Sequence, residues 1–213
     1  MKKLFRMCRN ESGMTIMELM VVFTVLIIVV GAAMSFLTFS QRQFMWIDTD
    51  QKIQVILRET LQHMTINIRD AKGVILGSDT NNLVVRLPNM DAVGNIQDYD
   101  TITYELDVAD SSSMLMELIQ TENSQHYGWG TRISQSYDAF KAETTTVWII
   151  VQGLANTDDH SSPPLFTYNE TDPLLVDNAS AVTTTLQVRK ESSPGKFQTQ
   201  ILSTSIRLRN KRD

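Results

Sequence analysis

The segment that decides the fold is Gly13-Met14-Thr15-Ile16-Met17-Glu18 followed by residues 19–39, LMVVFTVLIIVVGAAMSFLTF. Residues 19–39 carry no charge, and about 20 apolar residues in succession are enough to cross a bilayer as a helix. Many of them are β-branched and favour strands in water, but in a bilayer the backbone must satisfy its own hydrogen bonds, so a helix is expected. Glu18 lies at the edge of this run, where an ionisable side chain is costly and indicates a functional residue.

A short basic leader precedes the apolar run. Its charged residues are Lys2, Lys3, Arg6, Arg9 and Glu11. Because basic residues precede the run and none lies within it, we expect the N-terminus to stay in the cytoplasm and the C-terminal bulk to cross the membrane. The only cysteine, Cys8, lies in the leader, so a chain without its leader has no thiol for a disulfide or a Cys₂His₂ zinc site.

The charge of the chain argues against direct nucleic-acid binding, which needs a basic footprint. The leader holds four of the 19 basic residues and one of the 24 acidic ones, so the rest of the chain has 15 and 23 and a formal charge of −8. A basic cluster at residues 207–212 is interpreted as a solvated tail, with a local contact for an acidic partner as the alternative.

Helical periodicity continues beyond the apolar run. An apolar stripe recurs at spacings of three and four residues: Ile53, Leu57, Leu61, Met64 and Ile68. This pattern predicts an amphipathic helix that ends near Gly73. No proline lies between Met14 and Gly73, so the two halves are expected to form one long helix, with Asp48-Thr49-Asp50 as its weakest point.

After Gly73 the pattern changes to that of strands. Six segments are predicted to be strands: residues 82–87, 101–108, 114–119, 146–151, 184–189 and 200–208. Loops rich in Asp, Asn, Ser, Gly and Pro separate them, and residues 156–180 are expected to form a long loop. The predicted fold class is therefore α+β: a long N-terminal helix, with a membrane half and an amphipathic half, packed on an antiparallel β-sheet.

The basic leader ending in Gly13, the sequence Met14-Thr15-Ile16-Met17-Glu18 and the apolar run together resemble the prepilin-type N-terminal signal of type IV pilins and type II secretion pseudopilins. The pilin-like fold has the same order of helix and sheet. Residues 57–71 and 205–210 are most similar to J-type minor pseudopilins and W-type minor pilins. The resemblance implies four parts: a prepilin leader peptide (1–13), a transmembrane and assembly helix (14–39), the amphipathic half of the helix (40–73) and an antiparallel β globular domain (74–213).

The resemblance implies roles for three residues. Prepilin peptidase, a membrane-embedded aspartic protease, is expected to cleave after Gly13, where a residue without a side chain fits beside the cut bond. The same enzyme family typically N-methylates the new terminus, here Met14. Glu18 is expected to pair with the terminal amine of a neighbouring subunit, because pairing relieves the cost of both charges in hydrocarbon.

These roles place the chain in the bacterial inner (cytoplasmic) membrane as a single-pass protein with its C-terminal domain outside the cytoplasm, and then in a pilus or pseudopilus. The implied partners are prepilin peptidase, the inner-membrane assembly platform, and other pilin or pseudopilin subunits that meet the chain through their N-terminal helices.

One departure from major pilins concerns the proline that they commonly carry within the N-terminal helix. Here Gly31 and Ala33-Met34-Ser35 stand in that region. Gly costs about 1 kcal/mol in a helix interior, against about 3 kcal/mol for Pro, so local melting is expected to be weaker. The chain is therefore predicted to be a minor subunit of a type IV pilus, a type II secretion system or a competence pseudopilus.

The sequence gives no sign of catalysis. Neither a nucleophile elbow, a P-loop nor a dinucleotide motif is present, and the chain is not expected to be an enzyme or to need a cofactor. The three histidines lack metal-ligand spacing: His63, His126 and His160. The alternative is a Ca²⁺ site, with ligands from Asp158-Asp159, Asp172 and Asp177.

Two positions with aromatic or imidazole side chains have both a structural and a binding interpretation. His63 lies beside the apolar stripe and is expected at the surface or at the edge of the core. Gly128-Trp129-Gly130 presents either an exposed aromatic for a partner or a turn anchored by a buried Trp.

A competing interpretation is a secreted β-domain with an ordinary signal peptide, in which residues 19–30 are the apolar region and Gly31-Ala32-Ala33 the cleavage site. Another is a permanently anchored binding domain that never assembles. The signal-peptide interpretation accounts for the basic leader. It does not explain why Glu18 stands before the apolar run, or why an amphipathic stripe continues beyond the cleavage site at residues 31–33.

Overall fold

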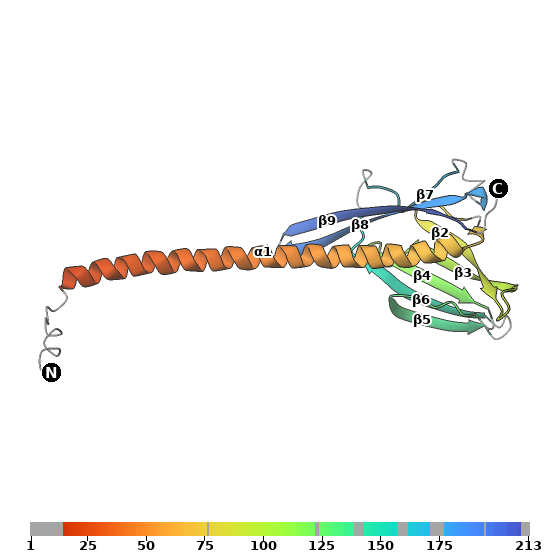
Figure 1. The fold of residues 1–213 in the computed structure, drawn as a ribbon, viewed down its shortest axis with the longest axis horizontal. Helices are drawn as coiled ribbons and strands as arrows, with labels where there is room; N and C mark the ends of the chain where they lie inside the picture. Colours follow the sequence, from red (N-terminus) through yellow and green to blue (C-terminus); the bar gives the residue numbers. More distant parts are fainter. Residues whose placement is uncertain are drawn as a thin grey trace, which may run out of the picture. The chain divides into compact units, whose positions relative to one another are not determined.

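The computed structural model describes residues 15–75, 77–121, 124–138, 143–156, 162–170, 177–193 and 195–209. Within them it has one helix followed by nine strands, which confirms the α+β class (Figure 1). The elements are α1 (Ile16–Asp70), β1 (Gly73–Val74), β2 (Asn82–Met90), β3 (Ile96–Leu106), β4 (Ser113–Gln120), β5 (Thr131–Asp138), β6 (Glu143–Gln152), β7 (Phe166–Tyr168), β8 (Ala181–Ser193) and β9 (Lys196–Arg207).

Helix α1 continues without a break through the expected weak point at residues 48–50. There the acidic side chains find partners one turn on. Asp48 Oδ2 lies 2.6 Å from Lys52 Nζ, and Asp50 Oδ2 accepts a hydrogen bond of 2.9 Å from Gln54 Nε2. The helix ends at Asp70, before the expected stop, and Gly73 is already the first residue of β1.

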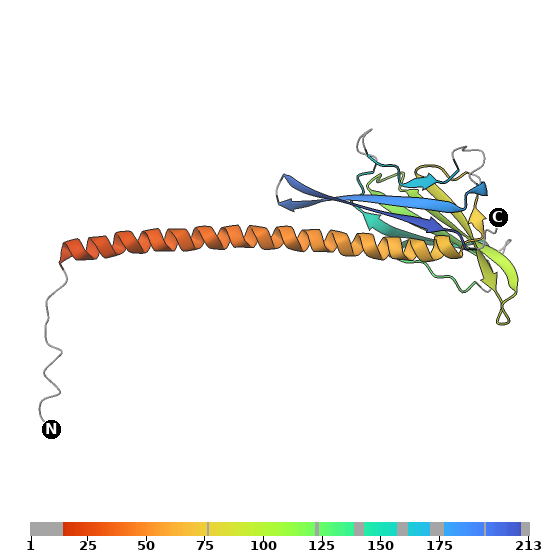
Figure 2. The same ribbon diagram turned by 45° about the horizontal axis from the view of Figure 1, so that its top comes forward.

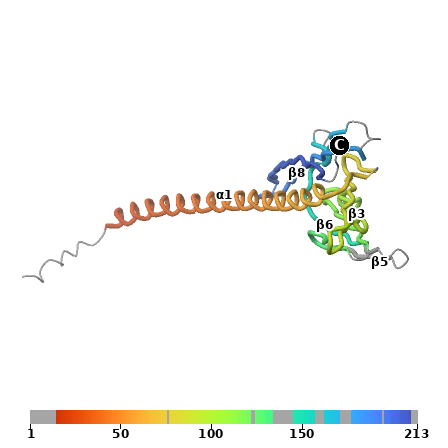
Figure 3. The backbone as a smooth tube through the Cα atoms, turned by 45° about the vertical axis from the view of Figure 1, so that its right-hand side comes forward, coloured from red at the N-terminus to blue at the C-terminus, as the bar shows by residue number. Residues whose placement is uncertain are grey.

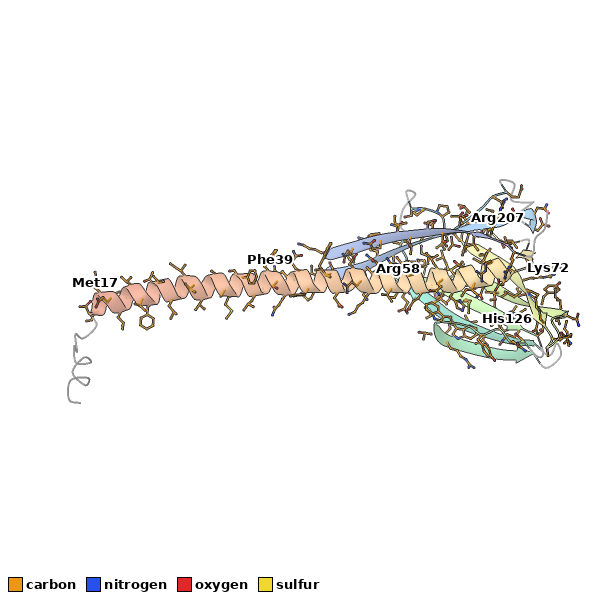
Figure 4. All side chains as sticks on the ribbon, in the orientation of Figure 1. Met17, Phe39, Arg58, Lys72, His126 and Arg207 are labelled. Atoms are coloured by element: carbon orange, nitrogen blue, oxygen red, sulfur yellow. The ribbon has the colours of Figure 1, made fainter. Side chains whose placement is uncertain are left out.

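The chain groups into two compact units that join between Trp46 and Ile47. In the first unit the large apolar side chains from Ile16 to Phe39 are exposed, and they project from the helix between Met17 and Phe39 (Figure 4). Among the described residues, α1 is the one helix long and apolar enough to cross a membrane.

The strands of the second unit form two antiparallel sheets, where the sequence led us to expect one. Six strands pair in the order β1-β2-β3-β4-β6-β5 and three in the order β7-β8-β9. In Figures 1 and 3 the blue strands of the smaller sheet lie apart from the green strands of the larger one. The segment after β6 joins the sheets, because Arg189 N donates to Gly153 O at 2.7 Å and Ala155 N donates to Gln187 O at 2.8 Å. Alternation along a strand predicts its buried face but not its partner, so the sequence did not show this division.

Residues 47–70 of α1 pack against the six-stranded sheet on one flank. Thr60 Oγ1 donates to Ile150 O of β6 at 3.4 Å, and Asn67 Nδ2 donates to the Tyr104 hydroxyl of β3 at 2.8 Å. Tyr104 is fully buried, and burial raises the pKa of its hydroxyl, although the Asn67 hydrogen bond opposes this.

The opposite flank of this helix segment contacts the three-stranded sheet. Asp50 Oδ1 accepts hydrogen bonds from Gln198 Nε2 at 3.3 Å and from Gln200 Nε2 at 2.7 Å. Near the other end, Arg69 O accepts from Arg209 N at 2.8 Å. The helix segment therefore lies between the two sheets, and β9 runs beside it (Figures 1 and 2).

The predicted apolar stripe forms the contact between this segment and the sheets. Its members are at most 4% exposed: Ile53, Leu57, Leu61, Met64 and Ile68. Burial of each such side chain contributes about 1.5–3 kcal/mol, which makes this stripe the main link between helix and sheets. The prediction of an amphipathic helix is confirmed.

Each of the six predicted strands is present as part of β2, β3, β4, β6, β8 or β9, although the predicted segments 101–108 and 200–208 run beyond the ends of β3 and β9. The sequence missed β5, which is mostly polar, and the short β7, which lies in the segment expected to be a loop. Both strands are held by pairing with partners nearby in the sheet, β6 and β8, and carry little local signal of their own.

Candidate functional site

The first candidate site is the N-terminal end of α1, where Thr15 and Glu18 form a capping box. Glu18 N donates to Thr15 Oγ1 at 3.2 Å, while Glu18 Oε2 accepts from Thr15 N at 2.9 Å and from Thr15 Oγ1 at 3.1 Å. These bonds satisfy backbone donors that the first turn of a helix leaves without partners. Thr15 precedes the first helical residue, so its hydroxyl caps the helix through Glu18 and does not bond back to a carbonyl of a preceding turn.

The capping box leaves part of the Glu18 carboxylate available. Both bonds from Thr15 end on Oε2, and Oε1 has no hydrogen-bond partner within the described part of the chain. Gly13 and Met14, the predicted cleavage and methylation positions, lie outside the described residues. The sequence places the α-amine of a chain that begins at Met14 one residue before the cap.

The polar side chains within the apolar run are satisfied by the helix itself. Thr24 Oγ1 donates to Met20 O at 2.8 Å, Ser35 Oγ to Gly31 O at 2.9 Å, and Thr38 Oγ1 to Ser35 O at 2.9 Å. Such bonds to the preceding turn remove the cost of an unpaired hydroxyl in hydrocarbon. The run is therefore compatible with lipid along its length.

The second candidate site is a buried carboxylate on β3, Asp100. It accepts hydrogen bonds from Thr121 N at 3.0 Å, from Thr121 Oγ1 at 3.1 Å and from Ser124 Oγ. His126 Nδ1 lies 2.5 Å from Asp100 Oδ2 and forms an ion pair when the ring is protonated. Asp100 is fully buried, whereas the His126 side chain is 28% exposed.

These contacts determine the charge of Asp100. Burial alone would raise the pKa of its carboxyl, but hydrogen bonds from His126, Ser124 and Thr121 outweigh burial and hold the pKa below its usual range. Ser124 donates to Asp100 rather than to the other nitrogen of His126, so the three side chains are not arranged as a nucleophile, base and orienting acid. The arrangement ties the segment after β4 to the middle of β3, beside the point where β3 begins to pair with β4.

A third cluster joins this same segment to the helix. The ring of Trp129 is partly buried against the core and stacks on His63 of α1, with centroids 5.7 Å apart and planes at 23°. Gly128 and Gly130 permit the approach: a Cβ on Gly128 would lie 2.2 Å from the Trp148 ring, and Gly130 has φ +102°. Of the two alternatives for this motif, the structure supports the turn anchored by Trp. His63 lies at the edge of the core, as predicted, and burial lowers the pKa of its imidazole.

A groove of about 480 Å³ lies between α1, the β5–β6 end of the large sheet and β8, with Ile53, Trp129 and Arg189 among its lining residues. No group of three His, Cys, Asp or Glu side chains in the described residues is placed to hold a metal. Asp158, Asp159, His160 and Asp172 lie outside those residues, so the Ca²⁺ alternative stays a prediction.

Sequence reasoning missed two features of these sites. The pattern Thr15-x-x-Glu18 before an apolar run is the usual signal of a capping box and was present to be used. The contact of Asp100 with His126 had no such signal, because 26 residues separate the two side chains. Comparison with protein-family models, with curated proteins and with solved structures gives no significant match.

Proposed function

We propose that the chain is a minor pilin or pseudopilin: a structural subunit that is cleaved after Gly13, N-methylated at Met14, and assembled into or at the tip of a type IV pilus, a type II secretion pseudopilus or a competence pseudopilus. The observation that carries the proposal is the N-terminal end of α1. A capped helix begins two residues after the predicted cut, keeps Glu18 at its first turn, and continues through residues 19–39 as an exposed run without charge.

The geometry of Glu18 fits a role in subunit pairing. In the capping box Oε2 is used and Oε1 is not. A positive α-amine at Met14 of a neighbouring subunit would find one carboxylate oxygen still open. Two opposite charges that enter hydrocarbon together avoid most of the cost that each would meet alone, so pairing provides both attraction and a fixed register between subunits.

The rest of the chain fits a minor rather than a bulk subunit. Helix α1 runs through Gly31 without interruption, and the helix has no proline at which to melt. Its amphipathic half is tied to the two sheets by buried apolar contacts and by the Asp50 and Arg69 hydrogen bonds. A helix that lacks a point at which to melt, and whose amphipathic half is fixed to the two sheets, suits a subunit that is placed once.

The ordinary signal peptide is the competing function. Signal peptidase needs an extended backbone at Gly31-Ala32-Ala33, whereas these residues lie inside α1, and Gly31 O also accepts a hydrogen bond from the Ser35 hydroxyl at 2.9 Å. Cleavage there would also remove the capped end and leave the amphipathic half without the segment that precedes it.

The intact mass of the mature protein separates these functions. We expect a chain that begins at Met14 and carries one added methyl group. A chain that begins near Met34 would support the signal peptide instead, and a full-length chain with its leader would exclude processing by prepilin peptidase.

The role of Glu18 needs a variant that keeps the cap but loses the charge. Glu18→Gln does this, because Gln at the third helical position also completes a capping box, whereas Glu18→Ala loses both. If charge pairing drives assembly, both variants fail to enter filaments while leader removal continues. If Glu18→Gln assembles as well as the wild type and only Glu18→Ala fails, Glu18 acts as a cap and the pairing role is wrong.

A further inference from the structure

Strand β9 ends the three-stranded sheet, so one of its sides has no partner strand within the described residues. The other sheet ends are short or irregular: β1 has two residues, β7 has three, and β5 pairs through a register shift near Arg132. Short strands and bulges are the usual means by which proteins blunt a sheet edge. β9 differs, since it has 12 residues and pairs with β8 in unbroken register from Phe197 to Arg207.

The pairing of β8 shows which backbone groups of β9 point outward. On its far side, β8 is bonded at odd-numbered positions, for example from Thr185 N to Leu165 O at 2.9 Å. In an antiparallel pair the residues alternate between the two sides, so the even-numbered residues of β8 face β9. Their partners in β9 are also even-numbered, as Thr184 is opposite Thr204. The odd-numbered N–H and C=O groups of β9 therefore point away from the sheet.

These outward groups form the open edge, which we define as the backbone of Thr199, Ile201, Ser203 and Ser205. No hydrogen bond among the described residues engages their N–H or C=O groups. Beyond Ser205, the next two N–H groups on this side are those of Arg207 and Arg209. The N–H of Arg209 donates to the Arg69 carbonyl of α1 at 2.8 Å. The helix thus limits the open edge at its C-terminal end.

The side chains of β9 do not protect the open edge. From Phe197 to Ile206 the strand contains no charge, proline or glycine, the residues that commonly discourage strand pairing. Ile201 is 56% exposed on the outer face, while Gln198 and Gln200 on the other face are held by Asp50 of α1. Next to the edge the outer face carries uncharged hydroxyl pairs: Thr183 with Ser205 at 3.1 Å, and Thr185 with Ser203 at 2.9 Å.

We propose that the open edge of β9 is a docking site for an extended strand of a different protein chain, which adds to the three-stranded sheet as a fourth strand. Alternating main-chain donors and acceptors over seven residues are complementary to a β-strand, and to no helix or compact surface. Along Ile201, Ser203 and Ser205 the surroundings carry no charge, which favours a strand whose flanking side chains are apolar or hydroxylic there. At the Thr199 end, Arg189 of β8 is the opposite residue, and its guanidinium lies 4.4 Å from the centroid of the Phe197 ring.

The direction of β9 argues against a second copy of this chain as the occupant. β9 runs in the same direction as α1, because Gln200 reaches Asp50 and Arg209 reaches Arg69 (Figure 2). Antiparallel pairing of two β9 strands about a two-fold axis would point the Ile47 ends of the two helix segments in opposite directions. Two chains whose N-terminal segments enter one membrane cannot pair in this way. This step rests on the membrane anchoring in the proposed function.

The test uses the full-length chain in its own cells, with a photo-reactive amino acid at Thr199 and, as a control position, at Val93 in the exposed β2–β3 turn. Ser203→Pro removes one outward N–H of the edge and leaves the bonds to β8 in place, since proline is tolerated where the N–H faces away from the sheet. Ser203→Ala keeps that N–H and is the matched control. Ile201→Lys places a charge beside the edge and is a second variant that does not depend on proline.

We expect a cross-link from position 199, and none from position 93, to a different protein, with the linked peptide in an extended segment. Its yield should fall roughly tenfold or more in Ser203→Pro and Ile201→Lys and stay unchanged in Ser203→Ala, as loss of a hydrogen bond with an unpaired carbonyl implies. The purified variants should unfold at the same denaturant concentration as the wild type. A variant that does not fold is excluded, and the other then decides.

Three results would overturn the proposal: an adduct of two copies of this chain, no adduct at position 199, or an adduct that neither folded variant weakens. The intact mass of the same samples keeps the two proposals apart. A chain processed at Met14 without an adduct overturns strand docking alone, and an unprocessed chain with an adduct overturns the pilin function alone.

Discussion

Replacing Asp100 tests whether the buried carboxylate holds the segment after β4 in place. The side chain accepts hydrogen bonds from Thr121 N and Oγ1, from Ser124 Oγ and from His126 Nδ1. A hydrogen bond to a charged group contributes about 1.5–3 kcal/mol, and a simple sum would rival the whole stability of a domain. Because His126 and its neighbours are only half-buried, water replaces part of the loss. For Asp100→Ala we expect the free energy of unfolding to fall by about 3–5 kcal/mol, the loss that is typical when one partner of a buried ion pair is removed.

Asp100→Asn separates the shape of the side chain from its charge. It keeps one acceptor oxygen for Thr121, so we expect a loss of only about 1–2 kcal/mol. Asp98→Asn, an exposed position on the same strand, is the control and should stay within about 0.5 kcal/mol. The measurement is urea unfolding of the full chain in detergent, followed by tryptophan fluorescence. At an m-value of about 2 kcal/mol/M, Asp100→Ala should lower the midpoint by roughly 1.5–2.5 M.

The pH dependence gives a second check on Asp100. The folded-state pKa of Asp100 lies below the ordinary value, so its ionised form stabilises the folded state. This contribution is fully present above the unfolded-state pKa of about 4, and it disappears as pH falls through the folded-state pKa. The difference in stability between wild type and Asp100→Asn should therefore be smaller at pH 3 than at pH 5. A loss below about 1 kcal/mol in Asp100→Ala, or a difference that does not shrink in acid, would refute the account of this cluster.

Three further substitutions address the packing of the second unit, each measured by the same unfolding assay. Gly128→Ala should cost about 1–3 kcal/mol because its Cβ would overlap the Trp148 ring, whereas Gly73→Ala, which meets no atom within 4 Å, should be nearly neutral; equal effects would contradict the close contact. Leu57→Ala, at a position 2% exposed, should cost about 2–5 kcal/mol, and Val55→Ala, at a position 51% exposed, should cost well under 1 kcal/mol; the reverse order would mean that the helix face is wrongly assigned. Burial lowers the pKa of His63, so the unfolded state binds its proton more tightly and stability should decline as pH falls below about 6.5; His63→Phe, which keeps an aromatic ring on Trp129, should lose this decline, and an unchanged pH profile would exclude His63 as its source.

The sequence predicted the features that depend on nearby residues. The stripe from Ile53 to Ile68 needs only the period of a helix, and the alternation in residues 101–108 and 200–208 needs only the period of a strand. The exposed run after Glu18 follows from composition alone. The capping box is an exception, because Thr15 and Glu18 have the local spacing that identifies one and it was not predicted. The bonds that Glu18 Oε2 accepts from Thr15 were therefore missed as well.

The features that escaped prediction depend on pairing between distant segments. Asp100 meets His126 because β3 and β4 are neighbours and the chain after β4 returns to β3 at Asp100, next to the first residue of β3 that pairs with β4. β5 is mostly polar and exists because β6 offers it an edge. Such contacts are set by the topology of the sheet, which periodicity within one segment does not specify.

Strand β9 combines both kinds of information. The alternation of apolar and polar residues along it predicts a strand with one wet face, and the exposed side chains of Ser203 and Ser205 lie on that face. Ile201 is an apolar exception on the same face, 56% exposed. The topology adds that the strand is last in its sheet, so that an exposed face and an unpaired main-chain edge occur together. Either feature alone is common on protein surfaces. An uncharged strand that has both, and that is held beside α1 at Asp50 and Arg69, is pre-ordered for pairing and has little conformational entropy left to lose when a partner strand binds.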